Sequence, residues 1–202
     1  MKNSNMLKVC GILILMVALM FIGGCITEDI TSKDEPSITF GKADYFMYSN
    51  INSLVDASNV IVVGEVISAG VVERINIAID ETRYERPLYF NFMVSELKIR
   101  EVIKGEVNPG DTMRVVQMGG AYSGNVVLIA RYEYLKKGQS GVFFLTYLPE
   151  WDMPANLINP EQGFVEVIAG EVISNDPFGL FEERMTEEML VDVLVQEEFS
   201  LR

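Results

Sequence analysis

Side chains with strong nucleophilic or metal-binding chemistry are scarce in this sequence. It contains two cysteines, Cys10 and Cys25, and no histidine. Without histidine there is no Ser-His-Asp or Cys-His arrangement, and every zinc site that needs an imidazole ligand is excluded. Catalysis would have to use carboxylates, lysine or tyrosine in a suitable geometry. The sequence therefore predicts no enzymatic activity, no cofactor and no metal centre.

Cys25 closes an apolar segment at the start of the chain. Lys2 and Lys8 provide a short basic beginning, residues 9–22 are apolar apart from one glycine, and Gly23 and Gly24 precede the cysteine. A basic start, an apolar core and small residues before a cleavage point are the parts of a secretory signal peptide.

The stretch IGGC (residues 22–25) resembles the lipobox of bacterial lipoproteins, in which an aliphatic residue stands three places before the cysteine. This resemblance implies cleavage between Gly24 and Cys25 and attachment of palmitate-type acyl chains to Cys25. Two acyl chains suffice for stable membrane anchoring. The protein is then expected on the extracytoplasmic side of the cell membrane, with a thiol-free body.

An uncleaved membrane-spanning anchor is the alternative for the same segment. Residues 9–22 fall short of the roughly 20 apolar residues that a spanning helix needs, although flanking side chains can snorkel. Both interpretations place the rest of the chain outside the cytoplasm and tether it to a membrane.

The charge of the chain is strongly negative, with 29 acidic against 16 basic residues and a formal net charge of −13. Lys2 and Lys8 lie in the expected signal peptide, which contains no acidic residue, so the part of the chain beyond it is more acidic still. Such a surface repels phosphates, which argues against a nucleic-acid partner. It favours solubility first, and it leaves recognition of cations or basic partners open.

Two loops offer candidate binding residues. The glycine-rich loop GGAYSG (residues 119–124) has no helix behind it to form a phosphate cradle, so it predicts a hairpin, with Tyr122 as a candidate contact. The tryptophan Trp151 lies between Pro149 and Pro154. It is a candidate anchor for a partner, or alternatively a cover over the mouth of a barrel.

Several carboxylates could donate oxygens to Ca²⁺, but their spacing is not that of an EF-hand, so no metal site is predicted. They are Glu150, Asp152, Asp176, Glu182 and Glu183.

The remaining pattern predicts a polar linker over residues 25–44 and one domain over residues 45–202. A short helix is expected over residues 49–58, with Ser49 or Asn50 as its cap and with Ile51, Leu54 and Val55 on one face. A C-terminal helix is expected over residues 186–199, capped by Thr186. The apolar face of the second helix should contain Met189, Leu190, Val193 and Leu194.

Strands are expected over residues 60–67, 84–103, 112–118, 126–130, 142–148 and 163–173. In the second of these the apolar positions change parity between Val94 and Leu97. A change of this kind is typical of a bulge or a sharp coil in a strand that curves around a barrel.

Three stretches in this region resemble the OB-like barrels of the netrin/TIMP-like group. They are ASNVIVVGEV (residues 57–66), EVIKG (residues 101–105) and GQSGVFFL (residues 138–145). The resemblance implies a mainly β domain with flanking helices, built on a small OB-like β-barrel; a β-sandwich is the alternative. Metalloprotease inhibition does not carry over, because the group's disulfides are missing and Cys25 would be lipidated.

These observations favour a lipid-anchored, extracytoplasmic binding or interaction module with an envelope protein as a possible partner. The alternatives are a carboxylate-based hydrolase of envelope glycans and a passive envelope protein.

Overall fold

The computed structural model describes residues 37–41, 44–78, 86–129, 133–151, 153–174, 176, 178–181 and 185–201. They belong to a compact unit of residues 36–202, separate from residues 1–35. The predictions about cleavage at Gly24 and lipidation of Cys25 lie outside the described residues. Within those residues, neither helix has the length and apolar character needed to span a membrane.

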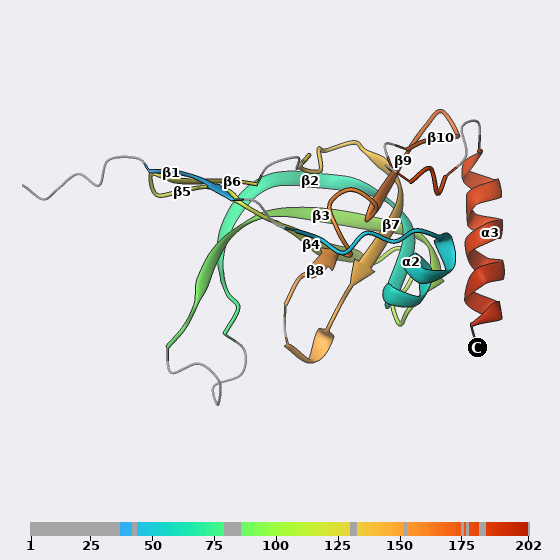
Figure 1. The fold of residues 1–202 in the computed structure, drawn as a ribbon, viewed down its shortest axis with the longest axis horizontal. Helices are drawn as coiled ribbons and strands as arrows, with labels where there is room; N and C mark the ends of the chain where they lie inside the picture. Colours follow the sequence, from blue (N-terminus) through green and yellow to red (C-terminus); the bar gives the residue numbers. More distant parts are fainter. Residues whose placement is uncertain are drawn as a thin grey trace, which may run out of the picture. The chain divides into compact units, whose positions relative to one another are not determined.

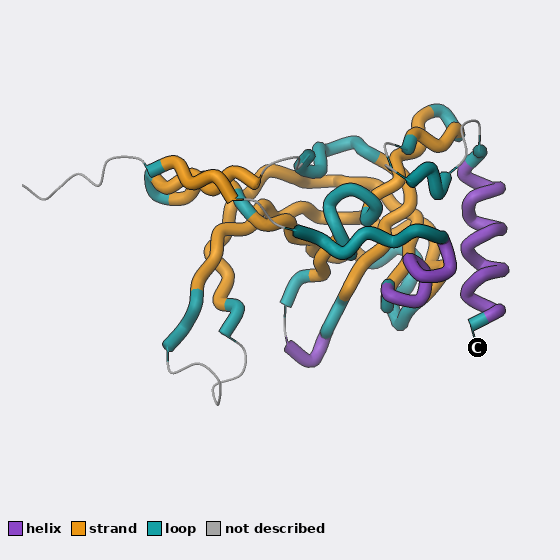
Figure 2. The backbone as a smooth tube through the Cα atoms, in the orientation of Figure 1, coloured by secondary structure: helices purple, strands orange, loops and turns teal. Residues whose placement is uncertain are grey.

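The described part of the chain is mainly β with two flanking α-helices, which confirms the expected fold class at this level (Figure 2). The helices are α2 (Ile51–Ala57) and α3 (Glu187–Ser200), with one 3₁₀ turn at Pro149–Trp151. The strands are β1 (Ile38–Gly41), β2 (Val60–Asn76), β3 (Tyr89–Lys104), β4 (Thr112–Met118), β5 (Gly120–Tyr122), β6 (Asn125–Ile129), β7 (Ser140–Thr146), β8 (Ala155–Leu157), β9 (Phe164–Ile168) and β10 (Glu171–Ile173).

The larger of two sheets has the order β10-β9-β7-β2-β3-β4-β8 (Figure 1). Its last strand, β8, pairs in parallel with β4 and also antiparallel with β7, through two residue pairs in each case. The sheet is therefore partly ringed. We call the five strands β2, β3, β4, β7 and β8 the ring.

The interior of the ring is filled by alternating side chains, as expected for strands with one face turned inward. Val60, Val62 and Val66 of β2 point into it. The other buried members of this cluster are Leu97, Ile99, Met113, Val115, Leu135, Phe143, Leu145, Ala155 and Leu157.

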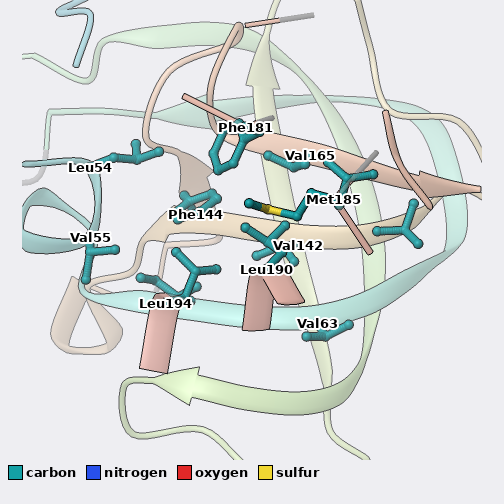
Figure 3. Packing of buried hydrophobic residues seen from close by; sticks show 13 residues of the cluster. Leu54, Val55, Val63, Val142, Phe144, Val165, Phe181, Met185, Leu190 and Leu194 are labelled. Atoms are coloured by element: carbon teal, nitrogen blue, oxygen red, sulfur yellow. The ribbon is translucent and has the colours of Figure 1, made fainter. Parts of the chain in front are cut away.

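A second core lies on the outer face of β2, β7 and β9 and is covered by both helices (Figure 3). Leu54 and Val55 of α2 and Leu190 and Leu194 of α3 are fully buried there. Because β2 and β7 carry apolar side chains on both faces, their sequences read as continuous apolar runs rather than alternating ones.

Both helices begin where the sequence predicts. The side chain of Asn50 accepts a hydrogen bond from the Ser53 amide and caps α2, and Thr186 accepts one from the Met189 amide and caps α3. The predicted apolar face of α3 is wrong at one position, because Met189 is 52% exposed.

The parity change in β3 is confirmed, since Val94 and Ser95 are both buried. The extra residues, however, lie in β2. Between the pairs Val66–Leu97 and Val71–Val94, residues 67–70 of β2 stand opposite residues 95–96 of β3. Gly70 provides the left-handed backbone there, with φ of 86°. The β2–β3 hairpin bends at this bulge (Figure 1). One face of β3 is therefore buried before the bend, and the opposite face is buried after it.

The smaller sheet has the order β1-β6-β5. The glycine-rich loop forms the β5–β6 hairpin, as expected, with positive φ at Ser123 and Gly124 in its turn. Strand β1 lies within the stretch predicted to be a linker, and it pairs in parallel with β6. The sequence signal for β1 is short, since only Ile38 and Phe40 alternate with other residues.

Two further differences concern the C-terminal part. The single strand expected over residues 163–173 is a hairpin of β9 and β10, with positive φ at Ala169 and Gly170. Strand β8 was not predicted, because three residues are too few to show a period.

Buried side-chain amides extend the backbone pairing beyond the strands. The Gln162 amide accepts a hydrogen bond from the Tyr48 N–H (2.9 Å) and donates one to the Tyr48 carbonyl (2.8 Å). The Gln117 amide bonds in the same manner to the Glu133 carbonyl (3.0 Å) and the Leu135 N–H (2.8 Å). We call such two-way contacts amide brackets. They hold irregular segments against the sheet as an additional strand would.

Candidate functional site

A pocket of about 830 Å³ lies at one end of the ring. Its lining residues lie at the beginning of β2, β4 and β8 and toward the end of β3 and β7. The β3–β4 turn and the β7–β8 loop contribute the others. All five strands of the ring thus reach this end, and two loops form its rim. A concave site with loops at its rim is the usual place for a ligand.

The floor of the pocket is apolar. Val60, Ile99 and Met113 line it, and all three belong to the cluster inside the ring. Met113 pairs with Leu97 across β3 and β4, and the Ile99 N–H donates a hydrogen bond to the Asp111 carbonyl (3.0 Å). Because the floor is part of the packed interior, its position is rigid compared with the loops above it.

One wall is fixed by an amide bracket from Asn59, the residue before β2. Its side chain donates to the Tyr147 carbonyl (2.6 Å) and accepts from the Tyr147 N–H (2.7 Å). The bracket uses only the backbone of Tyr147, so the half-buried phenol ring is left to line the pocket.

The rim carries three exposed carboxylates, those of Glu106, Asp111 and Glu150. The carboxylate of Asp111 is held by its own turn, where it accepts hydrogen bonds from the N–H (3.1 Å) and the side-chain amide (3.2 Å) of Asn108. Arg114 is also at the rim and forms an ion pair with Glu73 at 2.6 Å. The rim therefore favours ligands that donate hydrogen bonds or carry positive charge.

Trp151 directly follows Glu150 at the end of the 3₁₀ turn, and it is 50% exposed. It is next to the pocket-lining residues in the sequence. Both predicted roles, an anchor for a partner and a cover over a barrel mouth, are untested.

Tyr122 lies in a different place, on the smaller sheet. The Arg74 guanidinium sits over the Tyr122 ring at 5.8 Å and over the Tyr89 ring at 5.3 Å. Both tyrosines therefore stack on one cation. The structure does not bring the two predicted binding residues, Tyr122 and Trp151, into one site.

The carboxylates considered for Ca²⁺ are not brought together either, as far as the structure describes them. Asp176 accepts hydrogen bonds from the Gln162 side chain (2.7 Å) and the Leu180 N–H (2.6 Å). Asp152, Glu182 and Glu183 lie outside the described residues. Among those that are described, no group of three or more acidic or cysteine side chains is placed to hold a metal ion.

A second hollow, of about 510 Å³, is lined by residues that include Glu133, Tyr134, Glu161 and Glu166. Burial raises the pKa of the Tyr134 hydroxyl, and the neighbouring Tyr45 raises this pKa further. The Tyr134 hydroxyl donates a hydrogen bond to the Met118 carbonyl at 3.2 Å, which fits a neutral side chain. We regard this hollow as secondary because it is smaller than the first and its lining is more polar.

Sequence reasoning missed most residues of the main pocket. Residues 142–148 are predicted as a strand, but nothing in this stretch or in residues 104–111 indicates that the two meet. Tyr147 carried one usable signal, an aromatic residue at the end of an apolar strand just before Pro149.

No protein-family model matches the chain, and no curated protein is similar to it at a significant level. Its function therefore has to be inferred from the geometry of the described residues and from the sequence pattern.

Proposed function

We propose that this chain is a lipid-anchored, extracytoplasmic binding module that holds its ligand in the pocket at the end of the ring. The observation that carries the binding role is the pocket itself, with a rigid apolar floor, an aromatic wall and a polar rim. No catalytic activity is part of the proposal.

We infer that the ring is a small OB-like barrel. Five strands that close only partly, with β8 joining β4 to β7, support this architecture. In such barrels the loop between the fourth and fifth strands commonly contacts ligands. The corresponding loop here joins β7 to β8, and it contributes Tyr147, Glu150 and Pro154 to the pocket.

The ligand class follows from charge. A net charge of −13 and three carboxylates at the rim disfavour nucleic acids and other polyanions. Neutral or cationic ligands with hydrogen-bond donors, such as envelope sugars or basic peptide segments, suit an acidic rim above an apolar floor. Trp151 and Tyr147 supply the flat aromatic surfaces on which such ligands pack.

The binding role is tested by fluorescence titration, since Trp151 is the only tryptophan and reports from the edge of the pocket. The probes are a soluble N-acetylglucosamine oligomer and an oligolysine peptide, with a single-stranded oligonucleotide as the anionic comparison. We expect one of the first two to change Trp151 emission with saturation, and the oligonucleotide to cause no change.

The matched variants are Tyr147→Ala, within the pocket, and Tyr89→Ala, on the hairpin outside it. Tyr147→Ala keeps the amide bracket, because Asn59 contacts only backbone atoms of that residue. Binding that is weakened at least tenfold by Tyr147→Ala and unchanged by Tyr89→Ala supports the pocket. Equal effects of the two substitutions, or no saturable probe, would argue against it.

The anchor is tested separately by replacing Cys25 with serine in the full chain. Lipidation predicts that the wild-type protein partitions with membranes and lacks residues 1–24 by mass spectrometry. Cys25→Ser should remain unprocessed by the lipoprotein pathway. A wild-type protein that retains Met1 contradicts lipid anchoring but leaves the binding test intact.

The hydrolase alternative has no structural observation in its favour. The one buried carboxylate among the described residues, Glu198, lies on α3 and forms an ion pair with Lys104 at 3.3 Å, outside the pocket. Release of reducing sugar from the oligosaccharide probe would revive this alternative.

A further inference from the structure

The smaller sheet presents an apolar face to solvent. Cα register places Ile38 beside Val126 and Phe40 beside Leu128, so these four side chains share one face of the sheet. Ile38 is 60% exposed, Phe40 77% and Leu128 39%. We call these four residues the β1 face.

The opposite face of the same sheet packs on the body of the protein. A Cβ atom added to Gly120 would lie 2.8 Å from a methyl group of Val72 and 3.0 Å from the Met93 sulfur. Gly120 pairs with Val127, whose side chain is half-buried. Because side chains alternate along a strand, this contact fixes the β1 face outward.

The sheet is uncharged along its described length. Residues 37–41 and 119–129 contain no aspartate, glutamate, lysine or arginine, although 22% of the chain is charged. An exposed apolar face without charges is unusual on a soluble protein and indicates an interaction surface. Its neutrality also removes the repulsion that the acidic remainder of the chain would experience near a membrane.

The position of this sheet in the sequence indicates what covers it. Strand β1 is the first described element, and Ser37 follows Cys25 by 12 positions. A fully extended stretch of that length spans at most about 40 Å. An acyl chain on Cys25 would therefore keep the β1 face within that distance of the bilayer surface at all times.

We propose that the β1 face docks on the lipid bilayer, with Phe40 and Ile38 entering the boundary between headgroups and acyl chains. The proposal rests on the lipid anchor of the proposed function. The anchor raises the local concentration of the protein at the membrane. The smaller sheet orients the protein there, since apolar side chains on a rigid surface insert shallowly into that boundary. The module then lies on the membrane in one preferred orientation.

The test measures how deeply one side chain enters the bilayer. The full-length, processed protein carries Trp151→Phe, which removes the native tryptophan, together with either Phe40→Trp or Phe199→Trp. The two phenylalanines are a matched pair, since Phe40 is 77% and Phe199 72% exposed. Phe199 lies on α3, away from the smaller sheet (Figure 1). Each protein is reconstituted into phosphatidylcholine vesicles with or without brominated acyl chains.

We expect Phe40→Trp to be blue-shifted and to lose most of its emission in brominated vesicles, while Phe199→Trp keeps its emission. If the protein sediments with the vesicles and neither tryptophan is quenched, the anchor stands and docking through the β1 face is refuted. If it does not sediment with them, the lipid anchor itself fails, and docking fails with it.

The other occupants of the face give distinct results. A second copy pairing along the open edge of β1 would shift the Phe40→Trp emission to the blue in proportion to protein concentration, without quenching by brominated lipid. A protein partner would shift it only when native membrane extract is added. Either result overturns docking on lipid.

Discussion

At the residue scale, the described structure depends on side-chain amides that take the place of backbone groups. Gln162 is completely buried and bonds in both directions to Tyr48, while its amide also donates to Asp176 at 2.7 Å. One side chain thus joins three segments that are distant in sequence. A neutral amide suits this role because it offers donors and an acceptor without the desolvation cost of a charge.

Replacing Gln162 with leucine should lower the free energy of unfolding by about 3 kcal/mol, because each buried polar partner left without a hydrogen bond costs about 1–3 kcal/mol. Urea unfolding measures this change. Gln196→Leu on exposed α3 surface is the control and should change stability by less than about 0.5 kcal/mol. Similar values for the two variants would show that the bracket contributes little.

Stability should fall at alkaline pH because burial raises the pKa of both Tyr48 and Tyr134. The folded state holds these protons more tightly than the unfolded state, whose tyrosines have a pKa of about 10. The stabilising contribution is therefore complete below about pH 10 and is lost as the pH rises through the raised pKa of the folded state.

Urea unfolding of the wild type and Tyr134→Phe between pH 8 and pH 11 tests this expectation. The variant removes one of the two groups, so its stability should decline less steeply above pH 10. Parallel profiles would mean that Tyr134 does not contribute.

At the element scale, α3 is fastened to the ring by a partly buried ion pair. The Lys104 ammonium donates to the Val55 carbonyl at 2.8 Å and lies 3.3 Å from a Glu198 carboxylate oxygen. The side chain of Lys104 is 19% exposed and that of Glu198 10%. Lys104 therefore links the end of β3, the end of α2 and the last turn of α3.

Lys104→Met should destabilise the protein by about 3 kcal/mol, since removing one partner of a buried pair leaves the other charge in a poorly solvated place. The matched control is Arg100→Met. Arg100 pairs with Glu187 on the same helix at 3.1 Å, but these side chains are 46% and 29% exposed. That control should cost less than about 1 kcal/mol in chemical denaturation. Costs of equal size would contradict the importance of burial here.

Individual helices and strands were predictable from the sequence, whereas the contacts between residues far apart in the chain were not. The caps at Asn50 and Thr186 depend on neighbours three residues away, so the sequence pattern identifies them. The pocket depends on Asn59 meeting Tyr147 across 88 positions. In α3, Glu198 is buried where it pairs with Lys104, whereas the apolar Met189 is exposed.

At the scale of the whole molecule, charged residues are unevenly distributed. The chain carries a net charge of −13, yet the smaller sheet is uncharged. The partly ringed larger sheet fits a barrel-like or sandwich-like fold. The acidic composition argues against a nucleic-acid partner.

The protein should pass through a heparin column at physiological salt, because its charge repels polyanions. Retention that is reversed by added salt would reveal a basic patch that offsets the net charge, and it would reopen a nucleic-acid role. A basic protein of similar size, run on the same column, shows that the matrix retains polycations.

The order of attachments at the N-terminal end also determines how a mechanical load would be shared. Tension applied ahead of Ser37 would act first on the four residue pairs between β1 and β6, and next on the hydrogen bonds that join Phe46 to Asn159 and Tyr48 to Gln162. These contacts precede α2 in the chain, so they would bear such a load before α2 and the packed interior.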